Sequence, residues 1–145
     1  MENVFPETIC SKSYFKKTNA DDHLQSRIRN HCVMDKIAVY QKIIVSLINE
    51  IAAKPYGNAP GIERQVITDF SNNHFQLINI GWHRGCYTFS PLLHFDIRDG
   101  KIWVQHNDTE IEIGDELVAR GVDHKDVVFG FIPENERSLV KIAIA

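Results

Sequence analysis

Apolar residues recur at intervals of three and four positions between Met34 and Pro55. The series consists of Ile37, Tyr40, Ile44, Leu47, Ile48 and Ile51. This spacing places them on one side of an α-helix, so the pattern predicts a helix that packs against a core. Pro55 disfavours helical geometry at the residue before it, so we expect the helix to end there. The segment PYGNAPG, 55–61, has two prolines and two glycines and is typical of a loop.

Alternation with a period of two begins after this loop and predicts an antiparallel hairpin. Val66, Thr68 and Phe70 alternate with more polar neighbours, and SNN at 71–73 is typical of a turn. HFQLINIGW, 74–82, then alternates as well. The face predicted for this second strand carries Gln76, Ile78, Ile80 and Trp82.

A second hairpin is predicted around Asp99 and Gly100. Asp-Gly between alternating apolar residues favours a type I′ turn, in which both central residues have positive φ. The preceding strand, CYTFSPLLHFDI, contains Pro91, which indicates an edge position or a bulge near its start. Counting outward from the turn pairs Ile97 with Ile102, Asp96 with Trp103, Phe95 with Val104 and His94 with Gln105. In this register one face is apolar, and the other carries His94, Asp96, Trp103 and Gln105.

The last third of the chain predicts a short helix and two strands. Thr109 with Glu112 three positions later matches a capping box, and Gly121 is suited to close the helix after Leu117 and Val118. VVFGFI at 127–132, expected to be buried on both faces, and LVKIAIA at 139–145 have the composition of strands.

This order of elements predicts an α+β domain: helix, four strands, helix, two strands. We expect two helices and a mostly antiparallel sheet of about six strands. Residues 1–33 have weak periodicity and mixed charges, so we expect a weakly structured N-terminal extension before a domain at 34–145.

Composition and charge narrow the function classes. A chain of 145 residues, 43% apolar and 24% charged, is typical of one globular domain. The formal net charge of -3 provides no general attraction for the phosphates of DNA, so direct DNA contact would need a local patch. No apolar run is long enough to span a membrane and no signal peptide is recognisable, so we expect a cytoplasmic protein. The cysteines, Cys10, Cys32 and Cys86, are odd in number and far apart, and we expect free thiols.

Candidate chemistry is concentrated in HFDIRDGKIWVQHNDTE, 94–110. His94 and Asp96 share one face of a strand, but a metal site needs a third ligand. The predicted cross-strand neighbours, Trp103 and Gln105, are not usual ligands, and His106 falls on the opposite face in the predicted register. The spacing therefore favours a solvated or partner-facing surface over a metal site, and we expect neither metal nor cofactor.

Other acidic and nucleophilic residues give no support for catalysis. Asp108, Glu110 and Glu112 have the residue types of a magnesium site, but negative charge near a helix N-terminus explains them better. The chain has neither a G-x-S-x-G elbow nor a glycine-rich phosphate loop. We therefore expect no catalytic residues and a protein that is not an enzyme.

Trp82 and Trp103 have two interpretations. Aromatic side chains on strands usually pack in a core, but they are also enriched at protein interfaces. If both are exposed beside His94, Asp96 and Gln105, these five residues form a partner-binding surface.

The order and spacing of MDKIAVYQKII, NIGWHRG, LLHFDIRDGKIWVQHNDTE, IGDELVARGV and DVVFGF resemble the XisI family of fdxN element excision controlling factors. The resemblance extends from Met34 to the end, and PENERSLVKIAIA departs from the aromatic-rich ending of relatives. The positions that match the family motif are Gly81, Trp82, His94, Asp96, Asp99, Gly100, Lys101, Trp103, Gln105, Thr109, Glu116, Leu117 and Gly121.

The resemblance implies a small α+β protein, without catalytic residues, that acts beside an XisH-like partner in the programmed excision of a DNA element during heterocyst differentiation. In this family a separate recombinase cuts and joins the DNA strands, so a recombinase complex is a further potential partner. Self-association into a homo-oligomer is a further alternative that the sequence leaves open. One alternative is a small-molecule or metal-binding domain that uses the His94 and Asp96 face. Others are an antitoxin-like regulator of a nuclease-like partner, and direct DNA binding through Arg27, Arg29, Arg84, Arg98 and Lys101, which the net charge disfavours.

Overall fold

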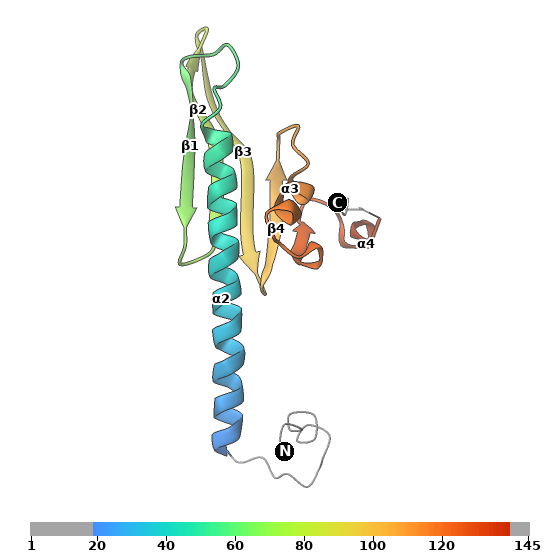
Figure 1. Cartoon of the computed structure of the whole chain (residues 1–145). Coiled ribbons are helices and arrows are strands. Elements are labelled where there is room, and N and C mark those ends of the chain that lie inside the picture. Colours follow the sequence, from blue (N-terminus) through green and yellow to red (C-terminus); the bar gives the residue numbers. More distant parts are fainter. Residues whose placement is uncertain (1–18, 140–145) are drawn as a thin grey trace. The chain divides into compact units, whose positions relative to one another are not determined.

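A helix and a five-stranded sheet make up most of the described chain, which comprises residues 19–139 of a computed structural model, with side chains from Val33 onward (Figure 1). The chain divides between Met34 and Asp35, and the packing described below concerns the part from Asp35 onward. Helix α2 (Asn19–Ala52) begins before Met34, so it extends into the segment expected to be weakly structured. The apolar periodicity of that segment is weak, and such periodicity was the signal used to predict the helix.

The end of α2 lies close to the predicted position, three residues before Pro55. The last carbonyl groups of a helix lack partners within the helix. Here Arg64 is such a partner, because its Nη1 donates to the carbonyl oxygen of Ile51 in the last turn at 2.8 Å, and also to that of Lys54 just after the helix at 2.9 Å. Arg64 comes from the first strand, so this contact joins the end of the helix to the sheet.

The sheet has the strand order β1-β2-β3-β4-β5. Its strands are β1 (Ile62–Asp69), β2 (His74–His83), β3 (Cys86–Arg98), β4 (Lys101–Asn107) and β5 (Val127–Phe129). The first four pair antiparallel as predicted, which confirms the α+β class. β5 instead pairs parallel to β4, because a helical connection separates the two strands.

The C-terminal strands differ from the prediction. β5 ends at Phe129, Phe131 is 53% exposed, and a short helix α4 (Glu134–Arg137) follows Pro133, so the apolar run at 127–132 is not a fully buried strand. Gly130 and Pro133 explain this outcome, since both residues disfavour the interior of a strand. Of the strand predicted at 139–145, only Leu139 lies in the described part, and it belongs to a turn.

The predicted second hairpin is confirmed at its turn. Asp99 and Gly100 have φ values of 52° and 71°, and Ile97 pairs with Ile102, Asp96 with Trp103, and Phe95 with Val104. The predicted pairing of His94 with Gln105 is wrong: His94 pairs with His106, because the register shifts between His94 and Phe95. A bulge adds one residue to one strand, and a count outward from the turn cannot anticipate it.

Helix α3 (Ile113–Ala119) forms where a helix was predicted, but without the capping box. Glu112 occupies the N-cap position and makes no side-chain capping bond. Thr109 instead lies in a turn before the helix, where its Oγ1 donates to Asn107 Oδ1 and accepts from the backbone N–H of Ile111.

Gly121 closes α3 as predicted. It has a φ of 105°, its N–H donates to the carbonyl of Val118, and the N–H of Val122 donates to the carbonyl of Leu117. These two bonds form a Schellman motif, in which the left-handed residue reverses the chain. Leu117 and Val122 are both buried, so the motif also anchors the loop to the core.

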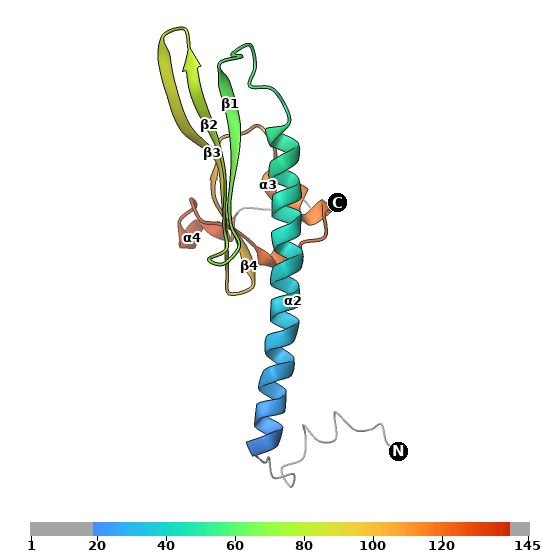
Figure 2. The ribbon, with the colours of Figure 1, turned by 90° about the vertical axis from the view of Figure 1, so that its left-hand side faces the viewer.

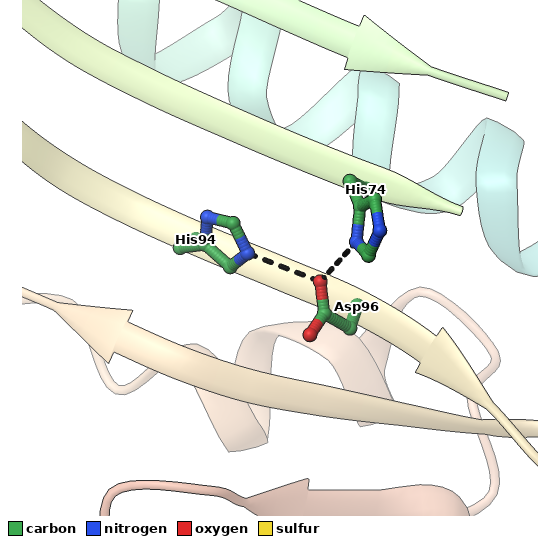
Figure 3. A group of neighbouring side chains, drawn as sticks. All are labelled: His74, His94 and Asp96. Carbon is green, nitrogen blue, oxygen red and sulfur yellow. Dashed lines mark hydrogen bonds and ion pairs between the residues drawn. The ribbon is translucent and has the colours of Figure 1, made fainter. Parts of the chain in front are cut away.

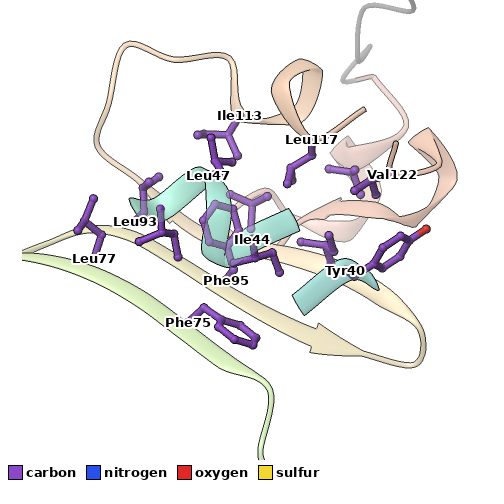
Figure 4. Packing of buried hydrophobic residues seen from close by; sticks show 14 of the residues in the cluster. Tyr40, Ile44, Leu47, Phe75, Leu77, Leu93, Phe95, Ile113, Leu117 and Val122 are labelled. Carbon is purple, nitrogen blue, oxygen red and sulfur yellow. The ribbon is translucent and has the colours of Figure 1, made fainter. Parts of the chain in front are cut away.

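The core lies on one face of the sheet, between the strands and α2 with α3 (Figures 2 and 4). Most of the predicted helix series is buried there with Phe75, Leu77, Leu93, Phe95, Ile102 and Val104 of the sheet. α4 lies on the opposite face (Figure 2). Among the described helices, we find none that is both long and apolar enough to cross a membrane.

Candidate functional site

Asp96 lies on the sheet face that α2 does not cover. It alternates along β3 with Phe95 and Ile97, which point into the core, so its side chain must point the other way. Its side chain is nonetheless only 3% exposed. A carboxylate at such a position is stable only when hydrogen-bond donors surround it, because burial removes its water.

Four side chains supply those donors, two for each oxygen of Asp96. Oδ1 lies 2.6 Å from His74 Nδ1 and 3.0 Å from His94 Nε2, as Figure 3 shows. Oδ2 accepts from Arg98 Nη2 at 2.6 Å and from Gln105 Nε2 at 3.0 Å. These five residues, His74, His94, Asp96, Arg98 and Gln105, are called the Asp96 cluster below.

The Asp96 cluster stabilises the ionised form of its carboxylate. Burial by itself raises the pKa of Asp96, but hydrogen bonds from His74, Gln105 and His94 outweigh burial and hold the pKa below its usual range. The site is therefore an ionised carboxylate, paired with the Arg98 guanidinium, with two imidazole rings on its solvent side. The exposed fractions of the His74 and His94 side chains are 50% and 29%.

Gln105 is held in place by the backbone after β5. A Cβ atom at Gly130 would lie 2.2 Å from Gln105 Oε1, so a larger residue there would have to displace the Gln105 amide. The Gly130 N–H also donates to the carbonyl of Val104, which fixes the two segments together. Glycine at position 130 thus leaves open the position in which the Gln105 amide contacts Asp96.

Trp103 pairs with Asp96 across β3 and β4 but makes different contacts. Two guanidinium groups lie over its ring: the Cζ atoms of Arg98 and Arg137 are 5.9 Å and 5.2 Å from the ring centroid. Arg137 also donates through Nε to the carbonyls of Phe129 and Ile132. The indole Nε1 is buried, and it has no acceptor among the described residues. Trp103 is therefore partly covered by the segment that contains α4.

The five residues predicted as a partner-binding surface do not lie together. His94, Asp96 and Gln105 belong to the Asp96 cluster and Trp103 is adjacent, but Trp82 is eight residues along β2 from His74, which is roughly 26 Å away at the usual rise of a strand. Trp82 is 62% exposed, and the centroid of its ring lies 5.2 Å from that of Tyr87. With the exposed Phe89 these two residues form a separate group, called the aromatic end below.

The most informative residue that the sequence did not reveal is His74. It pairs with Asp96 across β2 and β3, whereas the prediction considered only the partners of Asp96 on β4. The bulge between Leu77 and Ile78 sets this pairing, and no turn signal anticipates it. His106 was predicted on the face opposite His94. The bulge in β4 instead pairs it with His94, and the count from the turn did not include this bulge.

The three atoms His74 Nδ1, His94 Nε2 and Asp96 Oδ1 all lie within 4.8 Å of one another. Two imidazole nitrogens and a carboxylate oxygen are typical ligands of transition metals. Other candidate residues are not part of this group: Cys86 is an exposed free thiol, and Asp108, Glu110 and Glu112 form no metal-binding group among the described residues.

Comparison with known proteins identifies the family. The sequence model of the XisI protein family matches residues 34–144. The chain belongs to the XisI family. The matched residues include the Asp96 cluster, Trp103 and the aromatic end. In a separate comparison, none of the curated proteins matches the chain.

Two solved XisI structures share the fold. A XisI-like protein from Anabaena variabilis ATCC 29413 is 33% identical, with a TM-score of 0.67 over 75% of this chain and 99% of that chain. The fdxN element excision controlling factor XisI from the same strain is 24% identical, with a TM-score of 0.62 over 76% of this chain and 99% of that chain. Because each covered region spans nearly the whole of the solved chain, the α+β domain is the common unit of these proteins.

Proposed function

We propose that this XisI protein is a non-enzymatic controlling factor for the programmed excision of a DNA element, and that it acts in the cytoplasm through a complex with an XisH-like protein. The observation that carries the proposal is the family match over residues 34–144. The similar fold of a protein named as the fdxN element excision controlling factor supports the same function. Strand cleavage and joining are then the task of a separate recombinase.

The charge of the protein favours a protein partner over direct contact with DNA. The net charge is -3, and Arg98, one of the cations considered for DNA binding, forms an ion pair with Asp96 at 2.6 Å. A paired guanidinium contributes less to the release of counterions from DNA than a free one. Salt-dependent binding of a duplex by the purified protein would argue against this part of the proposal.

The aromatic end is the surface we propose for the partner. Trp82, Tyr87 and Phe89 are 62%, 54% and 65% exposed, although aromatic side chains are usually buried. Tryptophan and tyrosine are enriched among residues that dominate binding energies at interfaces. Direct contact with a partner would remove this apolar surface from water.

The test is co-purification of the native chain with an XisH-like protein, compared with two variants. Trp82→Ala removes the centre of the aromatic end, whereas Phe131→Ala removes an exposed aromatic residue that lies after β5. We expect the native chain and Phe131→Ala to form the complex and Trp82→Ala to lose it, with circular dichroism confirming that all three proteins are folded.

Failure of the native chain to form any complex would overturn the proposed function. Equal binding by Trp82→Ala would keep the partner but reject the aromatic end as its site. If a complex forms and a nuclease-like activity of the partner falls, the antitoxin-like form of regulation is supported over direct control of excision.

A further inference from the structure

Three potential metal ligands converge on the solvent side of the Asp96 cluster. They come from two adjacent strands: His74 from β2, and His94 and Asp96 from β3 (Figure 3). We propose that His74 Nδ1, His94 Nε2 and Asp96 Oδ1 bind one divalent transition metal ion of the Zn²⁺ type. This inference does not depend on the proposed partner, since every ligand belongs to this chain.

The separations of the three atoms come close to those that such an ion requires. Bonds of about 2.0–2.1 Å in tetrahedral geometry place ligand atoms roughly 3.4 Å apart. The two nitrogen–oxygen distances are 2.6 Å and 3.0 Å, and no pair of the three atoms is more than 4.8 Å apart. Side-chain rotations that move the imidazoles slightly away from Asp96 would open the required space. Both histidines have the freedom to do so, because their side chains are partly exposed.

The remaining contacts of Asp96 orient it as a ligand. Arg98 and Gln105 bind Oδ2 and leave Oδ1 directed at the two histidines. Hydrogen bonds of this kind, one shell beyond the metal, fix ligand geometry in known metal sites. Gly130 strengthens the arrangement because it makes room for Gln105. Asp96 is thus already held in a conformation in which one oxygen can coordinate.

The ligand types select the class of metal. Imidazole nitrogens with a carboxylate suit Zn²⁺, Fe²⁺, Ni²⁺ or Cu²⁺, whereas Mg²⁺ and Ca²⁺ prefer oxygen ligands alone. Three protein ligands leave one tetrahedral position for water on the exposed side. The positive charge of Arg98 opposes a bound cation, so we expect weaker binding than in a structural site built from cysteines.

Calorimetry with ZnCl₂ on tag-free, chelator-treated full-length protein tests the proposal, together with nitrogen NMR of the histidine side chains. We expect one ion per chain at this site, with the largest shifts at His74 Nδ1 and His94 Nε2. The NMR measurement uses the native protein and so does not depend on the folding of any variant. Absence of binding, or shifts confined to other histidines, would overturn the site.

Variants then assign the ligands. His74→Gln and His94→Gln keep a hydrogen-bond donor beside Asp96 but lose the imidazole ligand. We expect each to weaken Zn²⁺ binding by more than the roughly 10- to 100-fold caused by loss of a second-shell partner. The matched control is His124→Gln, since His124 lies 3.4 Å from Asp123 without a third ligand among the described residues. Unchanged affinity in both ligand variants would reject the proposal.

Discussion

His74 Nδ1 and Asp96 Oδ1 lie 2.6 Å apart although 22 positions separate the two residues in the chain. Their strands pair directly at this point, so the contact belongs to the sheet and not to a flexible loop. It adds a second imidazole to His94, Asp96 and Arg98, which alternate along β3 and are the part of the arrangement visible in the spacing of one strand. The site therefore depends on how β2 pairs with β3.

Asp96→Asn should destabilise the domain. An amide presents one oxygen and an NH₂ group, so it cannot accept from all four neighbours of Asp96: either Arg98 and Gln105 face the NH₂ group, or both histidines have to change the protonation of the nitrogen that faces it. Leaving such buried groups unsatisfied costs about 1–3 kcal/mol, which urea denaturation can measure. Asp108→Asn is the control, because Asp108 is exposed, and we expect a change within about 0.5 kcal/mol. Equal stability of the two variants would contradict this account.

Acid should lower the free energy of unfolding of the native protein more than that of the Asp96→Asn variant. Hydrogen bonding overcomes burial and lowers the folded-state pKa of Asp96, so the stabilisation is present above the unfolded pKa of about 3.9 and is lost as pH falls through the folded pKa. The free energies of unfolding of the two proteins should therefore converge below about pH 4.

Some acid sensitivity should remain in that variant. Burial raises the pKa of Asp126, but hydrogen bonds from Lys36 and Tyr40 outweigh it and lower the pKa overall. The measurement is chemical denaturation across the acid range. A constant difference between native protein and variant at all pH values would show that the charge of Asp96 does not stabilise the fold.

Gly130→Ala should act through Gln105. The new Cβ would displace the Gln105 amide, which would lose its bond to Asp96 at a cost of about 1 kcal/mol. In a Gln105→Ala background the obstacle is absent, so Gly130→Ala should cost little or nothing. A double-mutant cycle measured by urea denaturation detects this coupling. Additive effects would mean that position 130 does not control Gln105.

Gly121→Ala tests the end of α3. Its φ of 105° is unfavourable for a residue with a Cβ, although no atom beyond the two neighbouring residues lies within 4 Å of the position that the Cβ would occupy. The loss should therefore reflect backbone strain alone, at about 1–2 kcal/mol. Gly121→Asn should cost less, because asparagine tolerates left-handed conformations better than alanine. Thermal unfolding of both variants compares them, and equal losses would contradict the assigned cause.

Local signals predicted the elements up to β4 well, and they predicted the C-terminal strands and the long-range pairing poorly. The apolar series beginning at Ile37 predicted the buried side of α2, and Asp99 with Gly100 predicted a turn and the three nearest pairs. Both signals depend on residues close in sequence. The pairing of Asp96 with His74 on β2 depends on a bulge, which no local signal predicts. The contact of Arg137 with Trp103 depends on a change of direction after Gly130, and the apolar composition of 127–132 predicted a continuous strand there instead. The part of the site on β3 and β4 was therefore predictable, and His74 was not.

Arg137 should control how far Trp103 is covered. It joins α4 to the sheet through hydrogen bonds to two carbonyls, and its guanidinium lies 5.2 Å from the Trp103 ring. Arg137→Ala removes both contacts, so we expect Trp103 to become more accessible and the domain to lose about 1 kcal/mol.

Fluorescence can follow this change, because the chain has two tryptophans and Trp82→Phe leaves Trp103 as the single reporter. In that background Arg137→Ala should shift the emission to longer wavelength and increase quenching by acrylamide. Glu134→Ala, an exposed position in the same short helix, should change neither. If Arg137→Ala left the emission and the quenching unchanged, α4 would remain in place without Arg137, and the cover over Trp103 would have to come from the backbone of the segment after β5.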